Sequence, residues 1–380
     1  MGQASCACLH SDGCKLTTPL DQLSFDASIR PSEGVCDIKC SSCDHVVESK
    51  AKDAGVPLEA AFRRRRHLTR QAAGHGGDSI LKDMESLVTS NGAPLYIMKA
   101  FDAQEASNYQ RLQEMNDPMV RWTARFTGEV TLGETTDGSR RYMRLANLLA
   151  PFDTGPHVMD CKVGIRSFTE SEVAKKALRP DLYKRMLELD PNEPTEEERK
   201  AEACTKFRWM QFNDRYTHLA ELGFRIDGIA HSGPGGEAPK SELKAAHTSE
   251  QVARNILKHF LPKSRGPSDT SGDAGIRHAR RCVAELVLEE LRQMQAAMAA
   301  STWVRTHEFV GCSLLFVADG HGPSAGVFLI DFAKLQPLPP GVEIDHRSPW
   351  IPGNHEDGLF VGIAGLVKCW TDVLKLLPEA

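Results

Sequence analysis

The chain has 380 residues, of which 41% are hydrophobic and 26% charged, and its formal net charge is -5. A chain of this size buries a large core, and its ordinary composition predicts a soluble, cytoplasmic protein with two or more substructures. The negative charge argues against nucleic-acid binding, and the lack of a long apolar run argues against a transmembrane helix. The eleven cysteines follow no disulfide framework, as is typical of a reducing compartment. We expect five of them to be small core residues: Cys161, Cys204, Cys282, Cys312 and Cys369.

Residues 1–62 are rich in Ser, Asp, Cys and Gly and show no sustained period, which predicts a disordered tail. Its first eight residues, MGQASCAC, are a candidate lipidation signal. Gly2 becomes N-terminal once Met1 is removed and could be myristoylated, although Cys6 stands where the strict pattern has Ser or Thr. Palmitoylation of Cys6 and Cys8 would add a second acyl chain, which holds a protein at a membrane where one chain does not. The alternative is an ordinary tail with chance cysteines.

Two other stretches near the N-terminus carry candidate binding residues. Cys36, Cys40 and Cys43 have the spacing of a radical-type iron–sulfur loop, and together with His45 they could instead hold zinc. The favoured alternative is a solvated, cysteine-rich tail. The basic run Arg63–Arg66 could contact anionic lipid or a calmodulin-like partner, although such a run is more often simply solvated.

The next segments predict a small, mostly antiparallel lobe. Leu95–Phe101 is predicted as a strand carrying Lys99, and Ala103–Met115 as a helix with Glu105 in its first turn. A strand lysine followed by a helix acid is the arrangement with which kinases hold ATP phosphates, and the alternative is a surface lysine on an edge strand. Two more strands are predicted at Thr127–Leu132 and Arg141–Leu149, with a turn between them at Asp137–Gly138. Asn147 would lie where this sheet leads to a second lobe. The Gly-rich stretch Ala73–Gly77 is a weak signal for a loop that approaches a phosphate.

The stretch Pro156–Gly164, PHVMDCKVG, is the strongest chemical signal in the chain. Side chains alternate along a strand, so Asp160 and Lys162 point to the same side. The acid can accept a hydroxyl proton and the cation can hold phosphate charge, which suits phosphoryl transfer. The alternative is a surface salt bridge beside a turn.

A block rich in charged helix formers follows this strand. We predict helices at Glu170–Leu178, Asp181–Leu189 and Thr195–Asp214, the last beginning with a capping box, and a return to strand at Leu222–Ile229. Most of the many Lys and Arg residues fit a solvated helical face. A highly phosphorylated small ligand, however, needs several cations from different elements, and this block could supply them.

The C-terminal part predicts two helices, at Ser249–Leu261 and Ala279–Ala299, and a hairpin of strands at Gly311–Ala318 and Gly326–Phe332. Asp331 ends the second, buried strand. A carboxylate there is costly unless a charged group receives it, and Mg²⁺ is the natural recipient in a phosphoryl-transfer site. On the partner strand, the hydroxyl of Ser313 could add a ligand.

Together these stretches resemble the inositol polyphosphate kinase family. PHVMDCKVG matches the PxxxDxKxG signature of that family, and SLLF, IDFAK, HRSPW and GNHEDG follow in the order of its C-terminal motifs. The long helical block is similar to the branch that phosphorylates inositol 1,4,5-trisphosphate on its 3-hydroxyl, because the block is shorter in the multikinases and the hexakisphosphate kinases. The resemblance covers roughly residues 72–377.

The resemblance implies an α+β, two-lobed kinase-like fold (ATP-grasp/protein-kinase-like) that uses ATP and Mg²⁺. An ATP-binding lobe at 63–152 would precede a catalytic lobe at 153–380, which includes a helical, inositol-phosphate-binding insert at 165–221. By this resemblance, Asp160 would be the base and Lys162 a bridge between substrate and transferring phosphate. Lys99, with Glu105 as its partner, would hold the ATP phosphates, and Asn147 would lie near the ribose. Ser313 and Asp331 would be Mg²⁺ ligands, and the substrate would be bound by Arg179, Lys206 and Trp209.

Three departures from the family pattern concern the substrate. Trp209 stands where the family commonly has Tyr, and Asn213 and Ala230 stand where it has basic residues. Arg208, Arg215 or Arg225 could compensate for the lost charge. The hypotheses are therefore a trisphosphate 3-kinase, a multikinase of broader range, or an inactive, membrane-tethered polyphosphate-binding scaffold. The simultaneous presence of Lys99, Asp160, Lys162 and Asp331 argues against the third.

Overall fold

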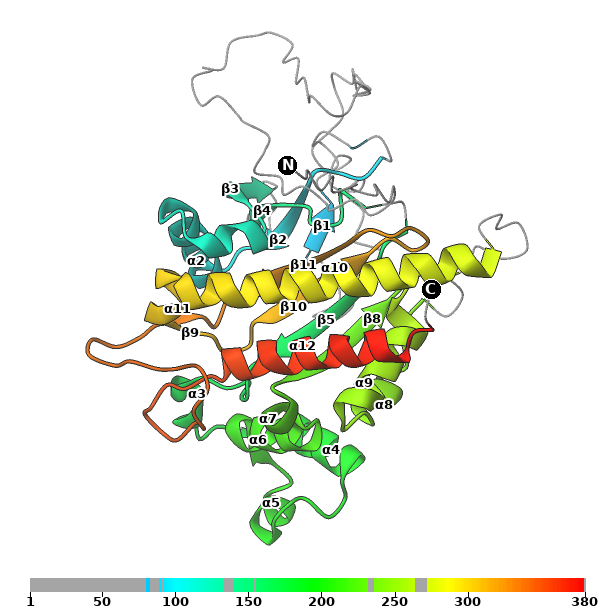
Figure 1. Cartoon of the computed structure of the whole chain (residues 1–380). Coiled ribbons are helices and arrows are strands. Elements are labelled where there is room, and N and C mark those ends of the chain that lie inside the picture. Colours follow the sequence, from blue (N-terminus) through cyan, green and yellow to red (C-terminus); the bar gives the residue numbers. More distant parts are fainter. Residues whose placement is uncertain are drawn as a thin grey trace, which may run out of the picture.

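The computed structural model describes residues 80–82, 89, 92–132, 140–152, 155–231, 236–263 and 272–378 (Figure 1). In this part of the chain, no helix is long and apolar enough to cross a membrane. Some predictions fall outside the described residues and stay predictions: the tail 1–62, Gly2, Cys6 and Cys8, the group Cys36, Cys40, Cys43 and His45, the run Arg63–Arg66, the stretch Ala73–Gly77 and the turn Asp137–Gly138.

The first sheet has four antiparallel strands in the order β1-β2-β4-β3. Helix α2 begins after Asp102, whose side chain accepts a hydrogen bond from the backbone N–H of Glu105 at 2.8 Å, as a helix cap should. The strands and helix predicted in this region are confirmed to within a few residues. The elements are β1 Ile80–Lys82, β2 Tyr96–Ala100, α2 Ala103–Glu114, a 3-10 helix at Pro118–Trp122, β3 Phe126–Leu132 and β4 Arg140–Ala146.

The second sheet is also antiparallel, with strand order β11-β10-β5-β8. Its strands are β5 His157–Val163, β8 Phe224–Ala230, β10 Ser313–Ala318 and β11 Ala325–Ile330. Interior strand β5 carries the PHVMDCKVG motif, and its register sets Lys162 opposite Ser313 on one side and Arg225 on the other. On β8, Asp227 is the extra residue of a bulge beside Asp160, and bulges of this kind re-aim side chains.

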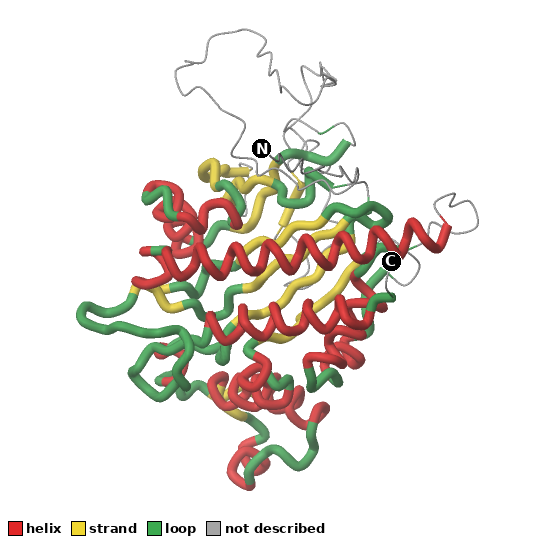
Figure 2. The backbone as a smooth tube through the Cα atoms, viewed as in Figure 1, coloured by secondary structure: helices red, strands yellow, loops and turns green. Residues whose placement is uncertain are grey.

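Helices cover one face of the second sheet, as Figures 1 and 2 show for the long helices α10 and α12. Helix α10 begins earlier than the sequence predicts, whereas the other predicted helix of this region is confirmed as α9 with a terminal π-helical turn. The elements are α8 Lys240–Lys244, α9 Ser249–Asn255, the π-turn Ile256–Phe260, α10 Gly272–Ala300, α11 Thr302–Thr306, β9 His307–Glu308, β12 Gln336–Pro337 and α12 Leu359–Leu376.

The main core lies between the second sheet and these helices. Phe316 of β10 stacks on Trp370 of α12 with ring centroids 5.7 Å apart. Helix α12 approaches the chain before β8 so closely that a Cβ at Gly362 would lie 2.4 Å from the carbonyl oxygen of Gly223, so a side chain cannot fit there. The five cysteines predicted as core residues are all buried.

The insert between β5 and β8 forms a separate apolar cluster and differs from the prediction in two places. The first helix ends at Val173 instead of Leu178, and Leu178–Arg179 form a short strand in which Arg179 is held extended by Pro180. The third is interrupted after Glu202, which adopts a left-handed conformation with φ +47°. The elements are α3 Glu170–Val173, β6 Leu178–Arg179, α4 Pro180–Leu189, α5 Glu196–Ala201, β7 Cys204–Thr205, α6 Lys206–Tyr216 and α7 Leu219–Leu222.

Candidate active site

Asp160 lies on β5 with its side chain buried, 6% exposed. Its Oδ1 atom has no hydrogen-bond partner among the described residues. Burial raises the pKa of this carboxyl to about 6; Lys162 opposes the rise, while Asp227 and Asp331 add to it. A buried carboxylate with an unsatisfied oxygen and a pKa near neutrality has the properties of a general base.

Lys162 is fixed by three oxygen atoms. Its Nζ donates hydrogen bonds of 2.8 Å to the carbonyl oxygen of Gly311 and to Oγ of Ser313, and forms an ion pair of 3.4 Å with Oδ2 of Asp331. Burial alone would lower the pKa of Lys162, but Asp331 and Asp160 raise it above its ordinary value. The ammonium group is therefore charged and oriented before any substrate binds.

Asp331 connects the two sheets. It directly follows β11 in the left-handed conformation, with φ +68°, and its Oδ1 accepts a bond of 2.8 Å from Nζ of Lys99 on β2. Burial would raise the pKa of Asp331, but Lys99 and Lys162 lower it below the ordinary value. The carboxylate of Asp331 thus forms ion pairs with Lys99 of the first sheet and Lys162 of the second, and it is ionised at neutral pH.

The contact between Lys99 and Glu105 that the resemblance implies is present, at 2.7 Å. Oε1 of Glu105 also accepts the backbone N–H of Phe332 at 3.3 Å, so α2 is tied to the residue after Asp331. Burial raises the pKa of Glu105, and Lys99 opposes that rise. These contacts place Lys99, Lys162 and Asp331 in one site, and their roles toward ATP stay predictions.

Lys206 is held by a carboxylate that the sequence did not single out. Its Nζ lies 2.5 Å from Oε1 of Glu172, whose Oε2 accepts from Nζ of Lys334 at 2.9 Å. Burial opposes ionisation, yet these two hydrogen bonds lower the pKa of Glu172 to about 2. Lys334 belongs to the IDFAK motif, three residues after Asp331, and that spacing was the signal that could have found it.

Arg179 and Trp209 have contacts within the insert. Arg179 is exposed and forms two bonds with Asp181, of 2.8 and 2.7 Å. Trp209 is half-buried in the apolar cluster of the insert, with its ring centroid 5.8 Å from that of Phe212. Their substrate-binding roles stay predictions.

Asn147 uses both ends of its amide to hold the chain between the sheets. Its Nδ2 donates to the carbonyl oxygen of Pro94 at 2.7 Å, and its Oδ1 accepts from the backbone N–H of Leu149 at 3.1 Å. The side chain is buried. These bonds shape the connection between the two sheets, and the contact of Asn147 with a ribose stays a prediction.

All three arginines considered as compensating cations are bound by carboxylates. Arg208 and Arg215 lie 2.7 and 2.5 Å from the same oxygen of Glu193. Arg225 is paired with Asp214 at 3.0 Å and with Asp227 at 2.7 Å. None of the three is therefore a free cation for a substrate phosphate.

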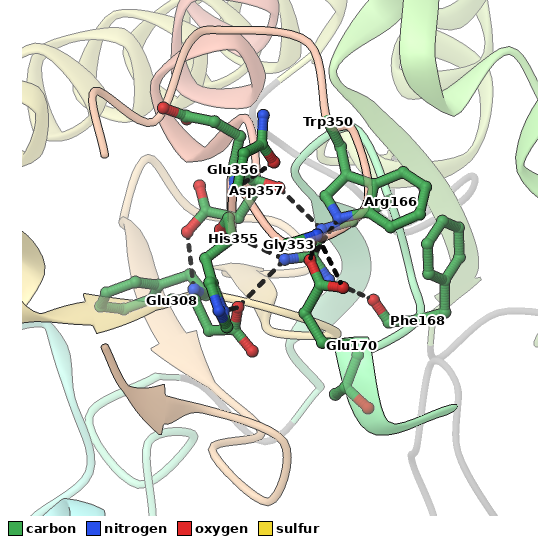
Figure 3. Close-up of polar contacts among 12 residues, drawn as sticks. Arg166, Phe168, Glu170, Glu308, Trp350, Gly353, His355, Glu356 and Asp357 are labelled. Carbon is green, nitrogen blue, oxygen red and sulfur yellow. Dashed lines mark hydrogen bonds and ion pairs between the residues drawn. The ribbon is translucent and has the colours of Figure 1, made fainter. Parts of the chain in front are cut away.

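The C-terminal motifs HRSPW and GNHEDG form a buried network around Arg166, just beyond β5 (Figure 3). The guanidinium of Arg166 donates to the carbonyl oxygens of Glu356, at 2.7 Å, and of Phe168, and to Oε2 of Glu308, at 3.1 Å. Gly164 at the end of β5 has φ +109°, and a Cβ there would lie 2.7 Å from the carbonyl oxygen of Asp357. These motifs thus fix the end of the strand that carries Asp160 and Lys162.

His346 and Asp357 complete this network. Nδ1 of His346 lies 2.9 Å from Oδ2 of Asp357, which also accepts the backbone N–H of Phe309 at 2.6 Å. Burial would lower the pKa of His346, but the carboxylate raises it. In the sequence these motifs pointed only to a family. Their contacts indicate that the motifs support β5, the strand that carries Asp160 and Lys162.

Two sheets with lysines converging on one carboxylate define a kinase-like site, and sequence comparison agrees. The profile of the family described as "IPK: Inositol polyphosphate kinase" matches residues 142–371. The chain belongs to the inositol polyphosphate kinase family, and its α+β fold is the kinase-like fold predicted from the sequence.

Curated relatives carry names from one branch of this family. The chain is 34% identical over 350 residues to an inositol-trisphosphate 3-kinase homolog of Caenorhabditis elegans, covering 91% of this chain and 62% of the relative. It is 36% identical over 316 residues to inositol-trisphosphate 3-kinase A of Mus musculus, covering 82% and 60%. The chain thus spans about 60% of the length of these relatives.

Among solved structures, the chain is similar to the inositol phosphate multikinase Ipk2 of S. cerevisiae, determined in complex with ADP and Mn²⁺. The TM-score is 0.48 with 20% sequence identity, and the match covers 74% of this chain and 99% of the other.

Proposed function

We propose that the chain is an ATP-dependent kinase that phosphorylates the 3-hydroxyl of inositol 1,4,5-trisphosphate to give inositol 1,3,4,5-tetrakisphosphate. The observation that carries this proposal is the pairing of an unsatisfied, buried carboxylate, Asp160, with Lys162, which is itself linked to Asp331. The names of the relatives, which are inositol-trisphosphate 3-kinases, support the same reaction.

In this mechanism Asp160 accepts the proton of the attacking hydroxyl. A pKa of about 6 leaves most of the carboxylate ionised at pH 7 and still close to the operating pH, which favours proton transfer. Lys162, held by Gly311 and Ser313, stabilises the negative charge between the attacking oxygen and the transferring phosphoryl group. Lys99, oriented by Glu105, binds phosphates of ATP.

We propose Mg²⁺ as the metal. In the described part of the chain, no cluster of three or more His, Cys, Asp or Glu residues could hold an ion alone. Asp331 fits a site completed by nucleotide phosphates, because its side chain is ionised and 37% exposed, and Mg²⁺ is commonly held by one or two carboxylates and phosphate oxygens. Ser313 is fully buried and its Oγ accepts a hydrogen bond from Nζ of Lys162, and its role as a second Mg²⁺ ligand stays a prediction. When bound, Mg²⁺ withdraws charge from the phosphoryl group.

The test is Asp160→Asn, compared with Asp273→Asn on the exposed start of α10 as a matched control. We expect kcat to fall by about 10²–10⁴-fold in Asp160→Asn, because an amide cannot take the proton, while the Kd for ATP stays the same. The control should behave like the wild type. A change confined to the KM for ATP would make Asp160 a binding residue and contradict the mechanism.

A second candidate function is a multikinase of broader substrate range. The supporting observation is that Asn213 and Ala230 carry no charge, while Arg208, Arg215 and Arg225 are all held by carboxylates. A panel of inositol phosphates, with the position of each new phosphate determined by NMR, distinguishes the two kinases. Failure to phosphorylate any of them with ATP and Mg²⁺ present would favour the inactive scaffold instead.

Two proposals about location and partners rest on sequence. Acylation at Gly2, Cys6 and Cys8 would hold a cytoplasmic enzyme at a membrane, where two acyl chains suffice. The run Arg63–Arg66 would add contacts with anionic lipid or bind a calmodulin-like partner.

A further inference from the structure

A small polar cavity lies beside β8, the edge strand of the second sheet. It has a volume of about 280 Å³ and lies where α8 packs against β8. Its polar lining includes Asn213 of α6, Arg225 and Asp227 of β8, and Lys240 and Lys244 of α8. The cavity therefore joins the insert, the catalytic sheet and a helix that follows it in sequence.

The lysines of this cavity lack counter-ions. No described carboxylate forms an ion pair with Lys240 or Lys244, and the carboxylate of Asp227 is engaged by Arg225 at 2.7 Å. On the neighbouring π-turn, by contrast, Lys258 is paired with Glu242 at 2.7 Å. The cavity thus carries unbalanced positive charge.

The electrostatics of Lys244 point the same way. Burial lowers its pKa, and Arg225, Lys240 and Arg185 lower it further, whereas Asp227 only partly compensates. Cations that repel one another in this manner are stabilised when an anion binds among them. Phosphate is such an anion, and it accepts charge-assisted hydrogen bonds from ammonium groups and from the amide of Asn213.

The cavity is next to the reactive pair. Arg225 is the register partner of Lys162, and Asp227 is close enough to Asp160 to raise the pKa of its carboxyl. Neighbouring strands are about 4.8 Å apart. A cyclitol ring is wide enough for one hydroxyl to meet Asp160 while a phosphate on another ring carbon reaches the edge of β8.

We propose that Lys240 and Lys244 form a phosphate subsite, in which they bind one phosphate of the inositol polyphosphate that is not involved in the reaction. The inference rests on the proposed function and assigns to α8 the charge that α6 lacks at Asn213. Because the subsite holds a spectator phosphate, it determines which inositol phosphates are accepted and leaves the phosphoryl-transfer residues untouched.

The test compares Lys240→Gln, Lys244→Gln and the double variant with Lys200→Gln, an exposed lysine of α5 that pairs only with Glu196 in the described chain. Each subsite variant should raise the KM for inositol 1,4,5-trisphosphate about tenfold or more, and the Kd measured by calorimetry likewise. The KM for ATP and kcat should not change. Lys244→Arg should retain most of the affinity because it keeps the charge.

A comparison of ligands makes the test specific to one phosphate. The Kd values of inositol 1,4-, 4,5- and 1,5-bisphosphate, each of which lacks one phosphate of the trisphosphate, are measured for the wild type and the double variant. If the lysines hold one spectator phosphate, the bisphosphate that lacks it should bind both proteins equally, while the other two should bind the double variant more weakly. An equal loss for all three bisphosphates and for the trisphosphate would indicate a general electrostatic effect and overturn the subsite.

Calorimetry separates this inference from the proposed function. If the wild type phosphorylates no inositol phosphate, the proposed function fails, and the Kd values for the trisphosphate still decide whether the lysines bind phosphate. If turnover is normal but neither KM nor Kd changes in the double variant, the subsite is wrong and the kinase assignment stands.

Discussion

Replacing Asp227 by Asn should move the pH profile of turnover toward lower pH. Asp227 is the bulged residue of β8, and after burial it is one of the two carboxylates that raise the pKa of Asp160. Removing its charge relieves the repulsion, so Asp160 loses its proton at a lower pH. Arg225 keeps Asp214 as a partner at 3.0 Å in this variant, so the local fold should survive.

The size of the effect follows from the pKa of about 6 for Asp160. In the wild type about a tenth of Asp160 is ionised at pH 5 and about nine tenths at pH 7. The rate should therefore rise about tenfold per pH unit below pH 6 and level off above it. In Asp227→Asn the rate reaches its plateau at a lower pH. The rate at pH 5, expressed as a fraction of the plateau rate, should therefore be larger than in the wild type.

The assay is kcat/KM for inositol 1,4,5-trisphosphate at saturating ATP, from about pH 5 to 8 at constant ionic strength, because the pH profile of kcat/KM reports the ionisation of Asp160 before this substrate binds. Phosphate groups of the substrate also titrate at about pH 6. Their titration is common to both enzymes, so the ratio of the two profiles isolates the group on the protein. Asp273→Asn is the control. Superimposable profiles, or a shift to higher pH in Asp227→Asn, would refute the assignment of Asp160 as the titrating base.

Three further changes test other parts of the site. Asp331→Asn should reduce kcat by about 10³-fold at saturating magnesium with little loss of folding, because an amide binds the metal poorly; near-normal activity would remove the metal assignment. Asn213→Arg should lower the Kd for inositol 1,4,5-trisphosphate about tenfold or more and narrow the substrate range. An unchanged ratio of kcat/KM for this substrate and the tetrakisphosphate would show that Asn213 does not face the ligand. Gly2→Ala should release the protein from membranes in cell fractionation, whereas equal solubility of both forms would mean that the first eight residues are an ordinary tail.

The strands of both sheets could be predicted because their apolar residues repeat with the period of a half-buried or buried strand. The insert was harder, since its helices are short and end for local reasons. The break at Arg179, which Pro180 keeps extended, agrees with the prediction, but the helix before it already ends at Val173. Glu202 is left-handed without being Gly or Asn, and charged helix formers on both sides of it concealed that break.

The candidate site shows a similar division. The motifs indicated Asp160, Lys162 and Asp331 individually, and the family resemblance brought them together with Lys99. Glu172, which holds Lys206 from 34 positions away, could not be found, because tertiary packing alone makes that pair. Nor does the sequence reveal Asp227 beside Asp160, since a one-residue bulge decides which way it points.

The insert leaves the sheet and returns to it at adjacent points. Val163 at the end of β5 pairs with Phe224 at the start of β8, and the N–H of Gly164 donates to the carbonyl oxygen of Gly223 at 2.8 Å. The residues between these two glycines therefore form one insertion between β5 and β8, and the two ends of this insertion are adjacent. Lengthening such a loop is inexpensive, about 0.6 kcal/mol for each doubling. Evolution, or a designer exchanging inserts between relatives, can thus alter the insert, which we predict to contact the substrate, while the strands that carry Asp160 and Lys162 keep their register.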